Sequence, residues 1–238
     1  MRRATLFLAL TALLTTAALT LVHARPQRVT FRTEDGVTIA ATWYEPAYRP
    51  APAVVLVHML QRSKRDWDSL AARLAGAGIG ALAIDLRGHG ESSDGAATEG
   101  STGYAAMVHD VRAARLFLAT RHDVLPGRIG IAGASIGANL AALAAADGAF
   151  ASVALLSPSL DYRGLRIEAA VRKYGGRPLL LVSSDDDPYA RRSALDLEKT
   201  GTSRELLSLV GAGHGTTMLS RSYELPQALI EFFRRTLQ

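Results

Sequence analysis

Short runs of apolar and β-branched residues alternate along this chain with longer stretches of helical periodicity. Ala53–Val57 and Ala81–Ile84 are apolar throughout, which predicts buried parallel strands, and Asp66–Ala77 between them predicts a helix. Parallel strands joined by crossover helices produce this alternation. We therefore predict an α/β fold, with a mostly parallel sheet of about eight strands and helices on both faces.

The rest of the chain continues this pattern. Val29–Thr33 and Val37–Tyr44 flank Glu34-Asp35-Gly36, and Asp-Gly between alternating segments predicts an antiparallel hairpin at the sheet edge. Further strands are predicted at Ile129–Ala132, Val153–Ser157, Pro178–Ser183 and Glu205–Val210, and further helices at Tyr104–Thr120, Gly137–Ala146, Tyr189–Lys199 and Ser222–Thr236. The segment between Ser157 and Pro178 has room for one short helix, so we expect no separate lid domain.

The first residues have the pattern of an export signal. Met1-Arg2-Arg3 is positively charged, Ala4 to Val22 is uncharged and rich in Leu, Ala and Thr, and Ala24 offers a small residue at a cleavage site. We expect residues 1–24 to be a signal peptide and residues 25–238 to be a single periplasmic or secreted domain. The alternative is an uncleaved N-terminal anchor, since about 20 apolar residues can span a bilayer. No later segment is long and apolar enough to do so, and we expect no membrane contact after cleavage.

The composition excludes several classes of function. The chain has no cysteine, which excludes disulfides, thiolate nucleophiles and Cys-type zinc or iron–sulfur sites. No H-x-H or H-E-x-x-H spacing occurs, so we expect no metal and no cofactor. The basic residues are scattered in pairs and triplets rather than one long run, so we expect no nucleic-acid partner. The oligomeric state is left open.

The pentapeptide Gly133-Ala134-Ser135-Ile136-Gly137 lies where a predicted strand ends and a predicted helix begins. A turn this tight needs small residues on both sides of the serine, and Gly133 and Gly137 meet that need. Ser135 would then project above the sheet at a helix N-terminus, where the helix dipole favours developing negative charge. The pattern therefore predicts a nucleophilic serine.

A serine hydroxyl needs a base to take its proton and a third group to hold that base. Of the six histidines, His214 stands apart, because Gly211-Ala212-Gly213-His214-Gly215 is a glycine-rich loop directly after the last predicted strand. We predict that His214 is the base.

The acid should follow a strand between Ser135 and His214. Ser183-Ser184-Asp185-Asp186-Asp187-Pro188 meets that condition with three aspartates, of which two are expected to serve only as turn or helix-start residues. Asp161, just after the preceding strand, is the alternative acid.

Together with the chain order serine, aspartate, histidine, the stretch Asp85-Leu86-Arg87-Gly88-His89-Gly90-Glu91-Ser92 resembles the α/β-hydrolase superfamily. The resemblance covers residues 29 to 237 and is closest to small esterases and the dienelactone-hydrolase-like branch. It implies that the D-x-R-G-x-G-x-S stretch is a structural loop. Aligned with a Gly-x-x-Asp-Pro acid loop, Ser184 replaces the glycine and Asp187 is the acid, with Asp186 still a candidate.

The same resemblance implies an oxyanion hole. Members place His-Gly-x after the third strand, and this chain has His58-Met59-Leu60, so the backbone N–H groups of Leu60 and Ile136 would be the donors. Met59 stands where glycine is usual. Candidate residues for the substrate pocket are Met59, Trp67, Tyr162 and Met218, with Tyr189 as a further aromatic near a strand end.

These residues together predict a lidless, exported serine hydrolase of the carboxylesterase type, acting on a small-molecule ester through an acyl-enzyme intermediate. A serine peptidase, an amidase or an acyl transferase would use the same machinery. A non-catalytic binding protein on a hydrolase scaffold is the alternative from a different class.

Overall fold

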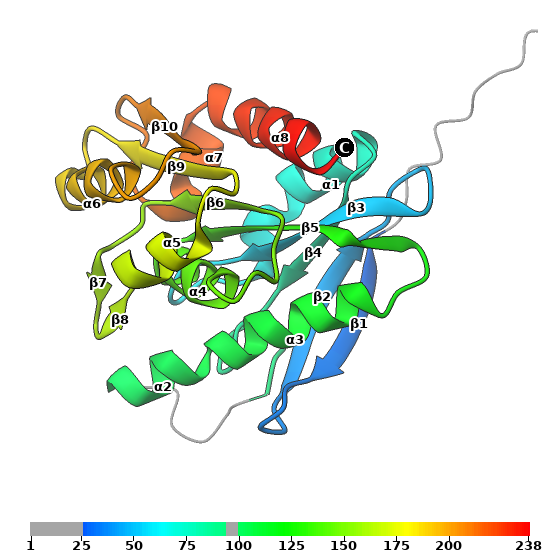
Figure 1. The fold of residues 1–238 in the computed structure, drawn as a ribbon. Coiled ribbons are helices and arrows are strands. Elements are labelled where there is room, and N and C mark those ends of the chain that lie inside the picture. Colours follow the sequence, from blue (N-terminus) through cyan, green and yellow to red (C-terminus); the bar gives the residue numbers. More distant parts are fainter. Residues whose placement is uncertain (1–25, 94–99) are drawn as a thin grey trace, which may run out of the picture.

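The computed structural model describes residues 26–93 and 100–238 and contains one large sheet (Figure 1). The strand order is β1-β2-β4-β3-β5-β6-β9-β10; β2 is antiparallel to β1 and β4, and all other neighbours are parallel. The strands are β1 Gln27–Arg32, β2 Thr38–Tyr44, β3 Ala51–Val57, β4 Gly80–Ile84, β5 Val124–Ala134, β6 Ser152–Leu156, β9 Leu179–Ser184 and β10 Arg204–Leu209. The predicted α/β fold is confirmed.

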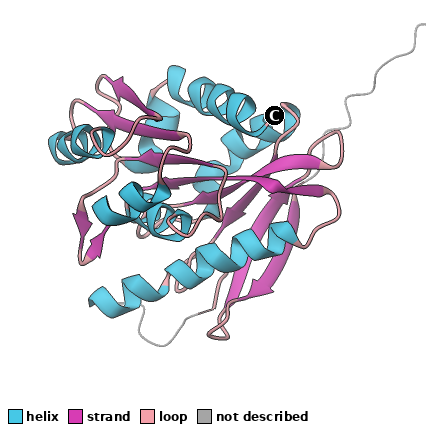
Figure 2. Cartoon of the chain, viewed as in Figure 1, coloured by secondary structure: helices cyan, strands magenta, loops and turns pink. Residues whose placement is uncertain are grey.

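Helices cover both faces of this sheet (Figure 2). Helices α1 and α8 pack on one face, and α3, α4, α5 and α6 pack on the other. The helical segments are η1 Lys64–Trp67, α1 Asp68–Gly76, α2 Gly100–Ala106, α3 Val108–Ala119, α4 Ile136–Ala145, α5 Glu168–Tyr174, α6 Pro188–Glu198, η2 Gly215–Thr217, α7 Met218–Arg221 and α8 Glu224–Leu237. Among the described residues, no helix meets the length and apolarity needed to cross a bilayer. The predicted signal peptide, residues 1–24, lies outside the described residues.

The sheet separates two hydrophobic cores, and the strand sequences show why. In β3, Val55 and Val57 face the core under α3 and α4, while Val54 and Leu56 face the core under α1 and α8. All seven β3 residues are buried, because successive side chains point to opposite faces and both faces are covered. This double burial explains why the central strands are uninterrupted apolar runs.

Two segments differ from the sequence-based expectation. Between β6 and β9, where one short helix was expected, a hairpin of β7 (Asp161–Tyr162) and β8 (Leu165–Arg166) precedes α5. The helix predicted over Tyr104–Thr120 is divided at Met107, where backbone bonds span three residues instead of four. Strands of two residues have no detectable period, so the hairpin left no hydrophobic signal to find.

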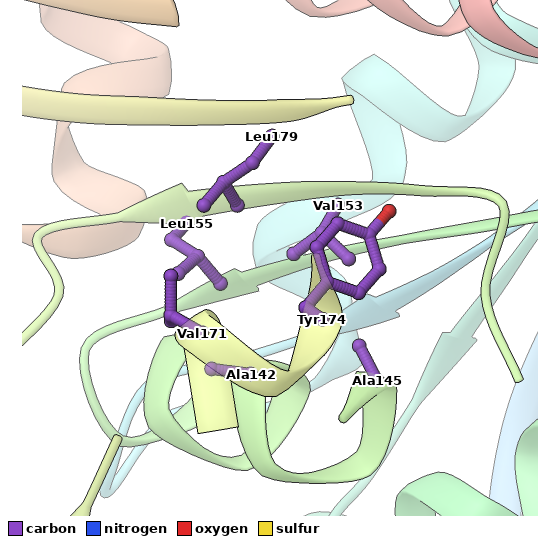
Figure 3. A pocket seen from close by; sticks show the side chains of 7 residues that line it. All are labelled: Ala142, Ala145, Val153, Leu155, Val171, Tyr174 and Leu179. Carbon is purple, nitrogen blue, oxygen red and sulfur yellow. The ribbon is translucent and has the colours of Figure 1, made fainter. Parts of the chain in front are cut away.

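Helices α4 and α5 lie close against the sheet (Figure 3). The side chains that meet there are Ala142, Ala145, Val153, Leu155, Val171, Tyr174 and Leu179. The gap between them leaves no space for a water molecule. The Tyr174 hydroxyl donates to carbonyl oxygens of the two loops that precede β6 and β9, at 3.2 and 3.1 Å. This contact fixes α5 against the strand ends opposite the predicted site.

A buried ion cluster holds the loop after β4, which contains the D-x-R-G-x-G-x-S stretch. Arg87 donates through Nε to Asp110 in α3 at 2.8 Å, and its backbone N–H donates to the same carboxylate at 2.9 Å. Its Nη1 and Nη2 reach Asp35 in the β1–β2 turn at 2.6 and 3.0 Å. Hydrogen bonds from Arg87 hold the pKa of Asp35 well below its usual range, whereas burial raises the pKa of Asp110. The loop is therefore tied to both α3 and the edge hairpin.

We expect Asp110→Ala to lower the free energy of unfolding by roughly 3 kcal/mol, because it leaves the buried Arg87 guanidinium short of a partner. Urea denaturation followed by circular dichroism measures the loss. Asp196→Ala is the control, since Asp196 forms an exposed pair with Lys199 at 2.9 Å and should cost less than about 1 kcal/mol. Equal losses in the two variants would contradict this account.

Candidate active site

Ser135 lies in the turn between β5 and α4 with φ 54° and ψ −119°, a region that residues other than glycine rarely occupy. Its flanking glycines allow the turn to close. A Cβ on Gly133 would lie 2.1 Å from the carbonyl oxygen of Gly137, and a Cβ on Gly137 would lie 2.5 Å from that of Val57. Strand β5, helix α4 and strand β3 therefore meet backbone to backbone, and the strained serine is held at the helix N-terminus.

His214 follows β10, and its Nδ1 lies 2.5 Å from Oδ2 of Asp187. Asp187 is also the N-cap of α6, where its Oδ1 accepts from the backbone N–H of Ala190 at 3.2 Å. The Asp187 carboxylate is mostly buried, with 15% of the side chain exposed, whereas half of His214 is exposed. One carboxylate thus begins a helix and orients the imidazole.

Ser135 and His214 line one pocket of about 240 Å³ above the carboxyl ends of the parallel strands. Its other lining residues are Ser157, Pro158, Ser159, Asp161, Tyr162, Arg163, Tyr189 and Ala190. In the described part of the chain no hydrogen bond joins Ser135 Oγ to His214. Such bonds between a nucleophile and its base often tighten only when substrate binds.

The residues next to Asp187 hold the histidine loop. Asp185 Oδ1 accepts from Gly211 N at 2.7 Å, and Asp186 Oδ1 accepts from Gly213 N at 3.0 Å. Between these two bonds, Ser184 Oγ accepts from the buried Ala212 N–H at 2.8 Å.

The backbone N–H groups of residues 211–213 are thus each bound by a side chain of residues 184–186. The next residue of the loop, His214, contacts Asp187 through its imidazole. The Ser184 hydroxyl also donates to Asp186, and this bond lowers the pKa of the Asp186 carboxyl. The aspartates expected to be plain turn residues are therefore the support of the His214 loop.

Asp161, the alternative acid, is engaged elsewhere. Its carboxylate accepts from Gly164 N at 2.7 Å and from Arg166 Nε at 2.9 Å, and these two bonds lower its pKa. It lines the pocket but has no hydrogen bond to His214 among the described residues. The geometry therefore favours Asp187 over both Asp161 and Asp186 as the partner of His214.

The loop after β3 is held by a buried histidine. Backbone N–H of Leu86 donates to His58 Nε2 at 3.0 Å, so the proton is on Nδ1, which donates to Met59 O at 2.7 Å. Burial lowers the pKa of His58 to about 4, and the ring is neutral at pH 7. The amides of Leu60 and Ile136, the two predicted oxyanion donors, have no acceptor within the described residues.

The predicted pocket residues have mixed outcomes. Tyr162 and Tyr189 line the pocket. Trp67 and Met218 do not, because both are fully buried in the core under α1 and α8. Met59 is absent from the lining as well; its Sδ packs against Gly215, where a Cβ would come within 2.6 Å of the sulfur.

Sequence reasoning missed Arg163, Ser157 and Ser159. Arg163 lies in the unforeseen β7–β8 hairpin, and the serines follow a strand whose end carried no distinctive motif. Within residues 26–93 and 100–238 no group of three acidic or histidine side chains is arranged to hold a metal ion.

Comparisons with known proteins identify a family for this chain. Residues 48–177 match the model of a family described as "Serine aminopeptidase, S33". An uncharacterized protein of Mycobacterium tuberculosis (strain ATCC 25618 / H37Rv) is 31% identical over 168 residues, which is 70% of this chain and 56% of that protein. The match thus spans little more than half of that relative.

Two other known proteins are matched over a larger share of their own length. A Rattus norvegicus protein, ABHD14B, whose name gives it the provisional role of a protein-lysine deacylase, is 29% identical over 193 residues, covering 76% of this chain and 83% of that protein. A solved structure of dienelactone hydrolase from Anabaena variabilis superposes with a TM-score of 0.71 at 19% identity, over 90% of this chain and 99% of that one. The latter likeness concerns the fold alone.

We expect His58 to make the free energy of unfolding depend on pH. Its folded pKa of about 4 lies below the value of about 6.5 in an unfolded chain, so between them only the unfolded state binds the proton. The contribution of His58 to the free energy of unfolding is complete above the pKa of the unfolded chain. Below that pKa it falls by up to about 1.4 kcal/mol per pH unit toward pH 4. Urea denaturation across this range should give a shallower pH slope for His58→Gln than for wild type. Parallel slopes would rule this out.

Ser184→Ala is expected to lower the free energy of unfolding by about 1 to 2 kcal/mol, because the buried Ala212 N–H loses its acceptor. Hydrogen exchange at residues 211–213 should accelerate in the variant, as the loop opens more often. The matched control is Ser208→Ala, on the exposed side of β10, which should change neither quantity. Unchanged exchange in Ser184→Ala would show that the loop does not depend on this bond.

Proposed function

Because the chain belongs to the α/β-hydrolase superfamily, in the family described as serine aminopeptidase S33, we propose that it is a serine hydrolase that cleaves small carboxylic esters. One observation carries this proposal. The 2.5 Å contact between His214 Nδ1 and Asp187 Oδ2 leaves Nε2 as the basic nitrogen of an imidazole that shares a pocket with Ser135.

In the proposed reaction Ser135 Oγ attacks the carbonyl carbon of the ester while His214 Nε2 takes the hydroxyl proton. The carbonyl π electrons move to the oxygen, and a tetrahedral oxyanion forms. Asp187 stabilises the imidazolium and keeps its ring oriented. His214 then gives the proton to the leaving alcohol as the C–O bond breaks.

The amides of Leu60 and Ile136 support this step as oxyanion donors, because both lack another acceptor among the described residues. The N-terminus of α4 adds a favourable dipole at the same point. Water, deprotonated by His214, then attacks the acyl-enzyme. As the second oxyanion collapses, the bond from the acyl carbon to Ser135 Oγ breaks, His214 returns the proton to Oγ, and a carboxylic acid is released.

Amide deacylation is the second candidate, and the name of the rat relative favours it. The same serine, histidine and aspartate would release an acyl group from a lysine side chain, with His214 protonating a leaving amine instead of an alcohol. Peptide cleavage, which the family description suggests, needs a groove for an extended chain. The pocket given by the described residues holds a small group, which favours the first two reactions.

We expect Ser135→Ala and His214→Ala to lower kcat/KM for p-nitrophenyl acetate and butyrate by about a thousandfold or more, since each removes a group that forms or breaks bonds. Asp187→Asn should lower it by about a hundredfold or more, because the amide no longer stabilises the imidazolium. Initial rates of p-nitrophenolate release and of deacetylation of an acetyl-lysine peptide are measured side by side.

His122→Ala, in the exposed turn between α3 and β5, is the matched control for His214→Ala and should retain wild-type rates. A higher kcat/KM for the acetyl-lysine peptide than for the esters would favour amide deacylation as the function. Ester rates that are equal in wild type and Ser135→Ala would overturn both ester hydrolysis and amide deacylation by Ser135.

A further inference from the structure

The pocket contains a cation that the reaction described above does not use. Arg163 lines the pocket together with Ser135 and His214. Asp161 also lines the pocket, and its carboxylate is already paired with Arg166. Among the described residues, no carboxylate lies within ion-pair distance of Arg163. The pocket therefore presents a positive charge without a protein counterion in the part of the chain that the structure describes.

Arg163 is held at the tip of the β7–β8 hairpin. The two turn residues, Arg163 and Gly164, have φ values of 50° and 94°, which is the pattern of a type I′ turn. Asparagine, aspartate or glycine is preferred at such positions, and a long side chain there costs stability. Strained residues of this kind are concentrated at functional sites, so an arginine at this point suggests a use for its side chain.

Aromatic rings fix the direction of the guanidinium. It lies 5.7 Å from the ring centre of Tyr104 and 5.9 Å from that of Tyr162, and its Nη1 donates to the Tyr104 hydroxyl at 3.1 Å. The two rings pack edge to face at 6.3 Å. Contacts of this type hold a cation in place without neutralising it, and leave other N–H donors of the fork available.

Resting on the proposed ester hydrolysis, we propose that Arg163 is a specificity-determining residue that binds a carboxylate on the substrate. The substrate class is then esters whose acyl group carries a second carboxylate, that is, half-esters of dicarboxylic acids. A guanidinium recognises a carboxylate through two parallel hydrogen bonds, which also fixes the direction of the acyl chain.

The size of the pocket agrees with a short chain. A volume of about 240 Å³ equals that of about eight water molecules at roughly 30 Å³ each, which is room for a short acyl chain. The acyl group of a glutarate half-ester is such a chain, with a free carboxylate at its far end. The serine attacks one end of this group while Arg163 binds the other.

The test compares charged and neutral esters of equal chain length. We measure methanol release from monomethyl glutarate and methyl pentanoate, and from monomethyl adipate and methyl hexanoate, with wild type, Arg163→Asn and Arg163→Lys. Asparagine suits a type I′ turn, so this variant is expected to fold at least as stably as wild type. Arg191→Gln removes one positive charge from the exposed surface of α6, outside the pocket lining, and is the control for net charge.

We expect kcat/KM of wild type to be about tenfold or more higher for the half-ester than for the neutral ester. In Arg163→Asn this ratio should fall by about tenfold. Lysine keeps the charge and should retain more of the preference than asparagine, and high salt should reduce the preference in wild type. A purely structural role would lower both rates together and leave the ratio unchanged. An unchanged ratio in Arg163→Asn, or the same loss in Arg191→Gln, would overturn the proposal.

A binding measurement separates this proposal from the proposed function. Glutarate is titrated into Ser135→Ala, with and without Arg163→Asn, by isothermal calorimetry. Ser135-dependent cleavage of neutral esters with no preference for half-esters and no glutarate binding would leave the hydrolase standing and remove the role of Arg163. Glutarate binding that requires Arg163, in a protein without ester hydrolysis, would keep the carboxylate site and remove the esterase.

Discussion

Contact between backbones at Gly133 and Gly137 is the constraint on which the site depends. Because neither residue has a side chain, β5, α4 and β3 approach so closely that a single methyl group would collide with a carbonyl oxygen. This approach forces Ser135 into a strained conformation and directs it away from the sheet. The same contact brings the loop after β3, with its buried His58, beside the serine, so the proposed nucleophile and the proposed oxyanion donors are positioned together.

A set of hydrogen bonds holds the loop that carries His214. Residues 184–187 bind residues 211–214 one for one, through a hydroxyl and three carboxylates. A glycine-rich loop loses much conformational entropy when it is ordered, and these bonds offset that loss. The acidic run therefore has two functions in the structure: one carboxylate orients the imidazole, and its neighbours order the loop that carries it.

The sequence was sufficient for the fold and for the residues with local signatures. Ser135 lies in a five-residue pattern at a strand end, and His214 lies in a glycine-rich loop, so both could be proposed from the sequence, and the structure places them on one pocket. The roles of Asp185 and Asp186 could not be proposed in this way, because their partners are distant in sequence and depend on the pairing of β9 with β10. Trp67 and Met218 were predicted to line the pocket because they are near strand ends, but both side chains are buried in the core under α1 and α8. Position near a strand end does not determine the direction of a side chain. Arg163 escaped notice because two-residue strands have no period.

His214 follows β10, the last strand of the sheet, which has a neighbour on one side only. Most of its residues are only partly buried, unlike the fully buried β3, β4 and β6. Edge strands with partial cover open at lower free energy than central ones. Ser135, the predicted nucleophile, therefore follows the buried end of a central strand, whereas His214, the predicted base, follows a partly exposed edge strand. On warming, β10 should open before the central strands do. The pocket that Ser135 and His214 share would then be lost while most of the sheet is still folded.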